Sequence, residues 1–486
     1  MARAGGLPLP TITDDRALGA ADIQRSLRFN DDDSASLTRT PSSAGNRKIF
    51  TLSVWIKRSK LGTDQAILDA QNSSGDQATL RFSSEGGSDN KIHVFYYNGS
   101  SFVYRVHTNA ELRDTNGWYH LIIAFDTTQA TAANRIKIYQ NGVQITSMGN
   151  SDYPSENYDT PFNNTVVHTI GRNGTASNYF DGYMAEFNFI DGQQLSPTDV
   201  GFTDSQTGLW MPKRYEGTYG TNGFYLDFSD NSSTAALGID KSPNGNDFTV
   251  NSPIAVTDSM LDTPTNIFCA WNPLSTSNLP DLQEGSLKNM GTNNTACNGT
   301  FGVTSGKWYW EQYCLTDISS SSYITTAGVT QYEMENDGDV EPRLGYTTGR
   351  SFYRGGSTGG YYNYKNYSQT SSTEVNSGGT YWGGKVVSFR LDMDAGTLKY
   401  YTNNTLVHTD SSIPTDGTRI FPLNSNTNSG TSRYNSIVSN FGQDSSFAGN
   451  KTAQGNTDEN GIGDFYYAVP SGFKALNLKN LPITTP

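Results

Sequence analysis

The chain has 486 residues, too many for one hydrophobic core, so two or three domains are expected. Only 17% of the residues are charged, and Gly, Ser, Thr and Asn are abundant, which is typical of short strands joined by many turns. The net charge is -13, and an acidic surface repels phosphate groups, so we expect no nucleic acid partner and no membrane insertion. The N-terminus lacks the apolar stretch of a secretory signal, and no apolar run approaches a membrane span.

The chain contains three cysteines, Cys269, Cys297 and Cys314. Their number is odd, and no pair has Cys-x-x-Cys spacing. A chain of this length does not need disulfides for stability. We therefore interpret them as core or free thiols of a protein made in a reducing cytoplasm.

Residues 1–24 are rich in Pro, Gly and Ala and have no hydrophobic period, so we interpret them as an N-terminal anchoring arm that becomes ordered on a partner. Strand patterns begin at residues 26–30, which alternate like an edge strand. Further strands are predicted at 50–58, 91–99, 102–106, 118–126, 135–146 and 180–190. Asn141-Gly142 within them predicts a type I′ hairpin.

The order of several motifs in this region resembles a laminin-G/concanavalin A-like jelly roll. The motifs are Leu-Ser-Val-Trp-Ile-Lys at 52–57, Trp-Tyr-His at 118–120, Ile-Tyr-Gln-Asn-Gly at 138–142 and Asp-Gly-Tyr-Met-Ala-Glu-Phe at 181–187. The resemblance implies an antiparallel two-sheet sandwich over residues 25–204. Residues 205–265 follow as a connector, and because they carry Trp210 and the aromatic run 224–228, we expect them to pack on both domains.

A second set of alternating segments extends from residue 306 to residue 443. It contains Gly-Lys-Trp-Tyr-Trp-Glu at 306–311, Leu-Gly-Tyr at 344–346 and Leu-Asp-Met-Asp at 391–394, with turn signals at 394–396 and 403–404. This order resembles the SPRY domain, which implies a second sandwich over 266–445 and a role in binding. Residues 446–486 look irregular, with residues 465–467 as the expected anchor.

The tandem of the two folds is similar to structural proteins of tailed phages, especially marine or cyanophage-like ones. The joining segments 223–229 and 260–266, the opening 26–33 and the ending 472–477 carry this resemblance. It implies an all-β fold of two concanavalin-like antiparallel sandwiches behind an anchoring arm. It also implies a virion protein that is assembled in the host cytoplasm, binds other virion proteins through its arm and forms a homo-oligomer.

The sequence shows no catalytic constellation that would predict an enzyme. Glycosidases of concanavalin-like folds place two carboxylates on a strand, but the acidic run 333–341 has the wrong spacing and contains the turn signal Asn336-Asp337-Gly338. We interpret this run as a solvated loop, with calcium capture as the alternative. The segment 240–247 resembles the start of a calcium loop, yet Asn251 stands where a Glu ligand is needed, which favours a plain turn.

The histidines likewise show no metal-binding spacing. They are His93, His107, His120, His168 and His408. For His120, inside a strand beside Trp118 and Tyr119, a packing role is favoured. We therefore expect no cofactor and no metal, with calcium kept only as the alternative above.

Tyrosine-rich loops are the remaining candidates for a ligand site. Aromatic faces stack on sugar rings, and Asn and Tyr groups bond to sugar hydroxyls, although the same chemistry serves protein interfaces. The alternative is that these tyrosines fill the strands of a sandwich. The candidate residues are Tyr353, Tyr361, Tyr362, Asn363, Tyr364 and Tyr367, with Tyr96 and Tyr97 as a weaker pair.

The sequence therefore predicts a non-enzymatic virion appendage, a tail fibre or receptor-binding part that recognises a host-surface glycan or protein. The first alternative is a capsid or tail decoration protein that binds only neighbouring virion subunits. The second alternative is a glycan-cleaving enzyme, which the missing carboxylate pair disfavours.

Overall fold

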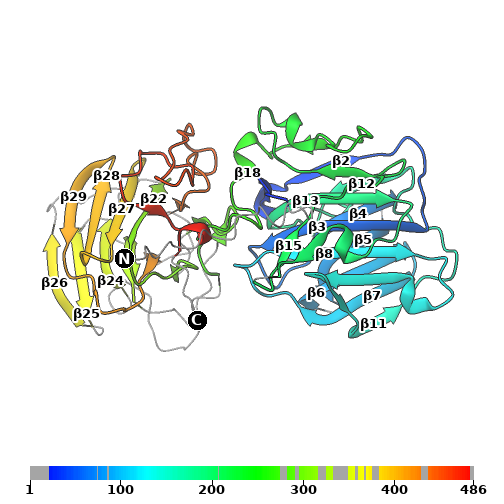
Figure 1. Ribbon diagram of the computed structural model, residues 1–486, viewed down its shortest axis with the longest axis horizontal. Helices are drawn as coiled ribbons and strands as arrows, with labels where there is room; N and C mark the ends of the chain where they lie inside the picture. The colour runs from blue at the N-terminus through cyan, green and yellow to red at the C-terminus, as the bar shows by residue number, and fades with distance from the viewer. Residues whose placement is uncertain are drawn as a thin grey trace, which may run out of the picture.

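A computed structural model of the chain shows two β-sandwiches side by side (Figure 1). It describes residues 21–73, 75–84, 87–205, 207–273, 282–290, 295–315, 324–331, 349–355, 360–365, 368–374, 383–427 and 436–481. These residues form strands, turns and short 3-10 helices, and none of them is in an α-helix. The 3-10 helices are Asp31–Asp33, Ala132–Asn134, Pro197–Asp199, Ala235–Gly238, Val256–Asp258 and Leu478–Asn480. No helix within the described ranges is long and apolar enough to cross a bilayer.

The first sandwich consists of two antiparallel sheets, which we call the junction sheet and the outer sheet. The junction sheet has the order β10 (Val143–Ile145), β9 (Ile136–Gln140), β8 (Tyr119–Asp126), β3 (Ile49–Arg58), β13 (Gly182–Asp191), β1 (Ser26–Phe29) and β18 (Ser259–Met260), with β16 (Phe224–Leu226) also on β13. The outer sheet has the order β11 (Met148–Asp152), β7 (Phe102–Glu111), β6 (Gly87–Asn98), β5 (Asp76–Ser84), β4 (Gln65–Ser73), β12 (Val167–Ile170), β2 (Ser36–Arg39) and β17 (Thr249–Asn251). A separate ribbon pairs β14 (Gly201–Thr203) with β15 (Trp210–Pro212).

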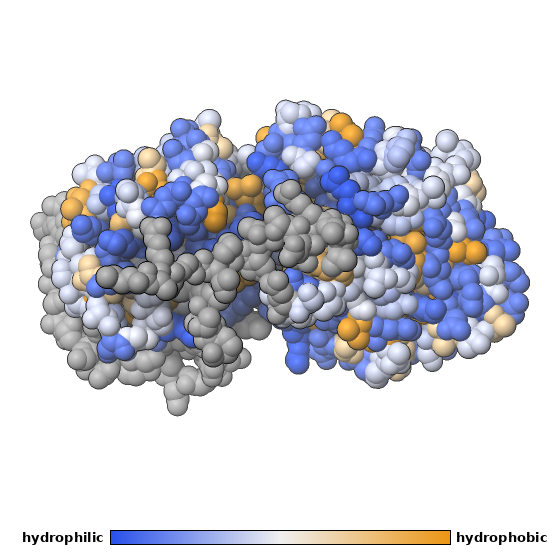
Figure 2. Space-filling model, in the orientation of Figure 1, coloured by the Kyte–Doolittle hydropathy of each residue, from blue (hydrophilic) through white to orange (hydrophobic). Residues whose placement is uncertain are grey.

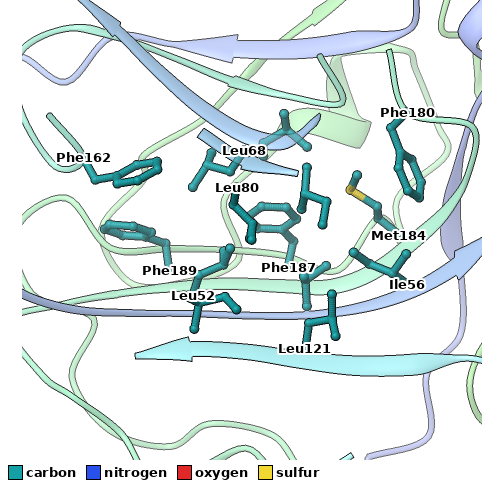
Figure 3. Packing of buried hydrophobic residues seen from close by; sticks show 14 of the residues in the cluster. Leu52, Ile56, Leu68, Leu80, Leu121, Phe162, Phe180, Met184, Phe187 and Phe189 are labelled. Carbon is teal, nitrogen blue, oxygen red and sulfur yellow. The ribbon is translucent and has the colours of Figure 1, made fainter. Parts of the chain in front are cut away.

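The core of the first sandwich lies between these sheets. Leu52, Ile56 and Leu121 from the junction sheet meet Leu68 and Leu80 from the outer sheet (Figure 3). Each of these side chains alternates with residues that face away, as the period of a strand requires. The all-β fold predicted from the alternation is therefore confirmed.

The junction sheet is buried on both faces, which the alternating sequence did not indicate. All ten residues of β13 are buried, as are nine of the ten in β3. The second face packs in a cluster that joins Trp55 and Tyr183 to Trp271 and Trp308 of the second sandwich. Without the second sandwich, this face of the junction sheet would be exposed to water.

The connector completes the first sandwich instead of merely following it. Its strand β16 pairs with β13, β17 extends the outer sheet beside β2, and β18 pairs with β1. The expectation that residues 26–30 form an edge strand is therefore wrong, because β1 lies between β13 and β18. The connector also reaches the junction, where Trp210 packs against the shared cluster.

The second sandwich is also built from two sheets. One has the order β19 (Leu282–Gln283), β20 (Lys288–Asn289), β31 (Ile437–Asn440), β22 (Lys307–Cys314), β27 (Val386–Asp392), β28 (Thr397–Thr402) and β29 (Thr405–Asp410), with β32 (Lys474–Ala475) parallel to β22. The other has the order β21 (Thr295–Asn298), β30 (Phe421–Thr427), β23 (Ile324–Thr330), β24 (Gly349–Gly355), β25 (Gly360–Lys365) and β26 (Ser368–Glu374). Trp310 stacks on Phe389 in its core at 4.9 Å between ring centroids.

The predicted turns have the expected backbone conformation, and the cysteines are buried thiols as expected. Asn141 and Gly142 both have positive φ, as a type I′ hairpin requires, and the same holds for Asn403 and Asn404 between β28 and β29. Cys269, Cys297 and Cys314 are free and buried.

The C-terminal segment, orange to red in Figure 1, lies over the side of the second sandwich that faces the first. Phe465 is fully buried against Phe268 and Tyr309. The backbone N–H groups of Tyr466 and Tyr467 both donate to the Glu311 carboxylate. The anchor predicted at residues 465–467 is therefore present, and it works through one buried ring and two backbone donors.

Candidate ligand-binding site

The outer sheet presents a row of polar and aromatic residues on the face opposite the core. Cross-strand pairing links Thr38, Thr169, Asp69, Thr79, Phe95 and Arg105 from β2 to β7. Their chain neighbours, such as Leu68 and Leu80, belong to the core. Since side chains alternate along a strand, this row points away from the core.

Two residues further along β4 and β6, a second row runs parallel to the first. It passes from Val167 through Gln71, Gln77 and Tyr97 to Phe102. Val167 and Phe102 are 43% and 45% exposed, so both ends of the row meet solvent. Four strand spacings of about 4.8 Å give the row a length of roughly 19 Å. We call these five residues the outer strip.

A groove of about 550 Å³ opens at the β12 end of the outer strip. Its lining is mostly hydroxyl, amide and backbone groups, with one guanidinium. The residues are Gln71, Asn72, Ser73, Val167, Thr169, Arg172, Gly174, Thr175 and Ala176. Two buried acceptors near it, Thr169 Oγ1 and Gln77 Oε1, have no hydrogen-bond partner. Buried polar groups are normally paired, so these two atoms are exceptions to that rule.

The loop that follows β12 forms one wall of this groove, and hydrogen bonds to Asp69 and Asn173 fix its position. Gly174 N–H donates to Asp69 Oδ1 at 3.0 Å, and the Thr79 hydroxyl donates to Asp69 Oδ2. Burial raises the pKa of Asp69 to about 6, although these donors favour its charged form. Asn173 Oδ1 accepts from Ser177 N–H at 2.9 Å and stabilises the turn.

Aromatic rings form the opposite end of the outer strip. Phe102 lies 5.3 Å from Tyr97 and 5.5 Å from the buried Phe95 between ring centroids. Arg105 lies 4.6 Å from the Phe102 centroid, and Arg81 covers Phe95 at 4.8 Å. The strip thus combines a stacking platform with a hydroxyl- and amide-rich groove, the two chemistries that sugar binding uses.

Strand alternation separates the pair Tyr96 and Tyr97, which the sequence offered together. Tyr96 packs against the core, 6.0 Å from Tyr104 and 6.3 Å from Tyr158, and burial with neighbouring Asp76 raises its pKa to about 12. Tyr97 belongs to the outer strip. Only one of the two rings is therefore placed to meet a ligand.

The tyrosine cluster of the second sandwich is only partly described. Tyr353 lies on β24, and Tyr361, Tyr362, Asn363 and Tyr364 lie on β25, with Tyr353 paired to Tyr361. Their side chains, and the whole of Tyr367, lie outside the described residues. The predicted site there stays a prediction.

Several buried ionisable groups have perturbed pKa values but are fully engaged in the fold. Burial raises the pKa of Glu186 to about 7 although Tyr225 Oη donates to both its oxygens, and that of Glu311 to about 7 although it accepts from four groups. Burial lowers the pKa of His120 to about 3; its Nε2 bonds to Ser53 Oγ and its Nδ1 accepts from Trp210 Nε1, each at 2.8 Å. His120 also stacks on Trp55 at 4.6 Å, so the predicted packing role is confirmed.

The segment 240–247 forms a turn, as favoured from its sequence. Asp240 accepts from the backbone N–H groups of Tyr225, Ser242 and Asn246, so both its oxygens serve the backbone. Among the described residues, no three His, Cys, Asp or Glu side chains form a metal-binding group. The acidic run 333–341 lies outside them.

The sequence interpretation missed the groove residues. The sequence patterns predict no binding role for Arg172, Asn173 or Gly174, nor for Gln71 or Gln77. The available signal was the polar alternation in residues 69–73 and 77–81. That alternation marks the exposed face of a strand but not which exposed faces adjoin.

Comparison with known proteins assigns the fold of the first sandwich to a known family. A search of curated proteins gave no match. Similar solved structures include a putative carbohydrate binding protein from Bacteroides ovatus ATCC 8483 (19% identity, 48% of this chain and 59% of that chain, TM-score 0.30). They also include domains LG4-5 of the mouse laminin alpha1 chain (9% identity, 90% of this chain and 92% of that chain, TM-score 0.29). A third is the SPRY domain of human HERC1 (15% identity, 35% of this chain and 96% of that chain, TM-score 0.22). Residues 29–201 match the family model of the concanavalin A-like lectin/glucanases superfamily, so the first sandwich is a concanavalin A-like domain.

Proposed function

We propose that this protein is a non-enzymatic recognition subunit whose outer strip binds a carbohydrate of a host surface. The observation that carries the proposal is that one row of paired residues connects the aromatic end, Tyr97 and Phe102, with the groove at Gln71. A roughly 19 Å strip is long enough for a short oligosaccharide. The rings would stack on sugar faces, and the polar side chains that line the groove, such as Gln71, Asn72 and Thr175, would bond to sugar hydroxyls.

We further propose that the protein is a tail fibre or receptor-binding appendage of a tailed phage. The resemblance of the tandem, its opening and its ending to virion proteins of such phages supports this setting. The surface in Figure 2 is mostly hydrophilic, with small scattered hydrophobic areas. Such a surface suits reversible recognition of a polar ligand better than permanent burial.

The choice of a non-enzymatic role rests on the state of the buried carboxylates. Glu186 and Glu311 are held by hydrogen bonds from tyrosines, backbone and Asn440, and both are buried. A glycosidase needs two accessible carboxyl groups on either side of the scissile bond. Release of reducing sugar from host polysaccharide by the purified protein would overturn this part of the proposal.

The decisive experiment compares neighbouring tyrosines. Tyr97→Ser together with Phe102→Ser should lower binding to host cells and to purified envelope glycan at least tenfold, because stacking is lost. The melting temperature should stay within about 2 °C, since Phe102 is exposed and Tyr97 half-buried. Tyr96→Ser is the matched control, and it should lower the melting temperature while the folded fraction retains binding.

The alternative role as a decoration protein makes the opposite prediction. If the Tyr97/Phe102 double variant binds host cells and glycan as the wild type does, the outer strip is not the recognition surface. The triple variant of Tyr361, Tyr362 and Tyr364 to Ser then tests the second candidate surface. Unchanged adsorption and unchanged stability in both variants would favour a subunit that binds only its virion neighbours.

A further inference from the structure

We propose that the junction between the two sandwiches holds a divalent cation, best matched by calcium, at Asp31 and Asp181. Asp31 begins the 3-10 helix after β1, and Asp181 directly precedes β13, so the two residues lie at neighbouring ends of paired strands. The site differs from the turn at 240–247 and from the acidic run 333–341.

The state of Asp181 is the first observation. The residue is 1% exposed, and neither of its carboxylate oxygens has a hydrogen-bond donor. The free oxygen of Asp31, Oδ1, is also buried and has no donor. The two carboxyl groups lie within hydrogen-bonding reach of each other. Two neighbouring carboxyl groups therefore carry three buried oxygens that have no hydrogen-bond donor.

The charge around this pair is the second observation. Asp31 Oδ2 is paired with Lys60, and Arg28 is shared among Asp258 at 2.8 Å, Glu284 at 3.2 Å and Asp444 at 3.4 Å. The negative charge of Glu284 also acts electrostatically on Asp181. The carboxylates of this network therefore outnumber the cations Arg28 and Lys60, which leaves a partly buried excess of negative charge. Such an excess favours binding of a cation.

The chemistry of the oxygens selects the ion. Calcium accepts carboxylates that bind through one or both oxygens, together with backbone carbonyls and water, in irregular geometry. Asp181 can supply two oxygens and Asp31 one, and backbone carbonyls or water would complete the shell. Magnesium requires a stricter octahedron, and zinc prefers nitrogen or sulfur ligands, which neither residue supplies.

A shared proton is the competing explanation. Burial and the neighbouring Asp31 raise the pKa of Asp181 well above its usual value, which describes the site when no cation is bound. A bound cation would reverse this effect, because it stabilises both charged carboxylates. The two explanations therefore differ in their response to added calcium.

The test uses the full-length protein after treatment with a chelator. Addition of calcium chloride at pH 7.5 should raise the melting temperature by about 5 °C at a hundredfold excess over Kd, and magnesium should raise it less. Terbium(III) provides a direct binding measurement, because Trp118 and Tyr183, 6.2 Å apart at the same junction, would sensitise its luminescence. Calcium should then displace terbium and quench the signal.

Matched variants assign the effect to these two residues. Asp181→Asn and Asp31→Asn should each abolish the calcium shift and the terbium signal. Asp33→Asn changes an exposed neighbour that bonds to Asn30 Nδ2 at 2.9 Å, and it should retain both. The proposal is overturned if the wild type shows no calcium shift and no terbium signal, or if Asp181→Asn and Asp31→Asn keep them.

Discussion

Lys57 and Asp262 form an ion pair that is buried between the first sandwich and the connector. Lys57 Nζ lies 2.8 Å from Asp262 Oδ2, and the two side chains are 2% and 1% exposed. Trp118 Nε1 donates to the other oxygen, Asp262 Oδ1, at 3.0 Å. The backbone carbonyl of Asp262 also accepts from the Ser26 hydroxyl at 2.6 Å. One connector residue thus contacts β3, β1 and the segment before β8.

Asp262→Ala should destabilise the protein by about 3–5 kcal/mol, because it leaves the Lys57 ammonium buried without a partner. Denaturant unfolding, followed by tryptophan fluorescence, measures this loss. The double variant Lys57→Met with Asp262→Leu should recover part of it, since it removes both charges but still leaves Trp118 Nε1 without its acceptor. The control is Asp152→Ala, which breaks a solvent-exposed pair with Arg105 and should cost less than about 1 kcal/mol. An equal loss of unfolding free energy in Asp262→Ala and Asp152→Ala would contradict the view that burial makes the Lys57–Asp262 pair important for stability.

The buried histidine His120 should make stability fall as the pH drops below 6.5. Burial lowers its folded pKa to about 3, so between pH 6.5 and pH 3 the unfolded chain takes up a proton that the folded chain does not. Stability attributable to His120 is therefore complete above pH 6.5 and lost progressively towards pH 3. His93, with a pKa of about 3, and His168, with one of about 4, act in the same direction.

The measurement is the pH dependence of the unfolding free energy between pH 4.5 and pH 6. His120→Gln should reduce the slope by up to about 1.4 kcal/mol per pH unit, whatever its effect on absolute stability. A slope equal to that of the wild type would show that His120 is protonated in the folded protein.

Glu311 should have the opposite pH dependence and should hold the C-terminal segment in place. Its folded pKa is raised to about 7, so its contribution is present at low pH and lost as the pH rises from about 4.5 through 7. Tyr466 N–H donates to Glu311 Oε2 and Tyr467 N–H donates to Oε1, so Glu311→Gln places an NH2 group against one of these two donors. We expect a loss of about 1–3 kcal/mol and faster proteolysis within residues 446–481.

Hydrogen exchange at Tyr466 and Tyr467 measures this effect directly. The matched control is Glu459→Gln in the same segment, where the carboxylate is exposed and accepts one N–H, from Gly472 at 3.2 Å. It should leave exchange at both tyrosines unchanged. Unchanged protection in Glu311→Gln would mean that Phe465 alone anchors the segment.

The proposed anchoring role of the N-terminal residues can be tested with two deletions that differ by four residues. Ile23 is buried in the cluster that joins Trp55 and Tyr183 to the second sandwich, and its N–H donates to Thr265 Oγ1 at 3.0 Å. Deletion of residues 1–20 should therefore leave the melting temperature unchanged but abolish incorporation into particles. Deletion of residues 1–24 should also lower the melting temperature, because it removes Ile23. Normal occupancy of particles by the first deletion would place the anchor elsewhere in the chain.

The sequence by itself determined the all-β class, several turns and many of the strands, although β4, β5 and β12 of the outer sheet were not predicted. These features depend on local physics: side chains alternate along a strand, and Asn141-Gly142 adopts the positive φ that a type I′ turn needs. The same logic identified residues 465–467 as an anchor and His120 as a packed residue. Such predictions succeed because a few neighbouring residues decide these features.

Only the tertiary structure decided which faces meet. Alternation in β3 and β13 predicts one buried face, yet both are buried because the second sandwich packs on the junction sheet. The outer strip arises because the register places Gln71, Gln77 and Tyr97 side by side across three strands. The Asp31–Asp181 pair joins residues 150 positions apart through the pairing of β1 with β13. Register and domain packing are long-range properties, and no local pattern in the chain encodes them.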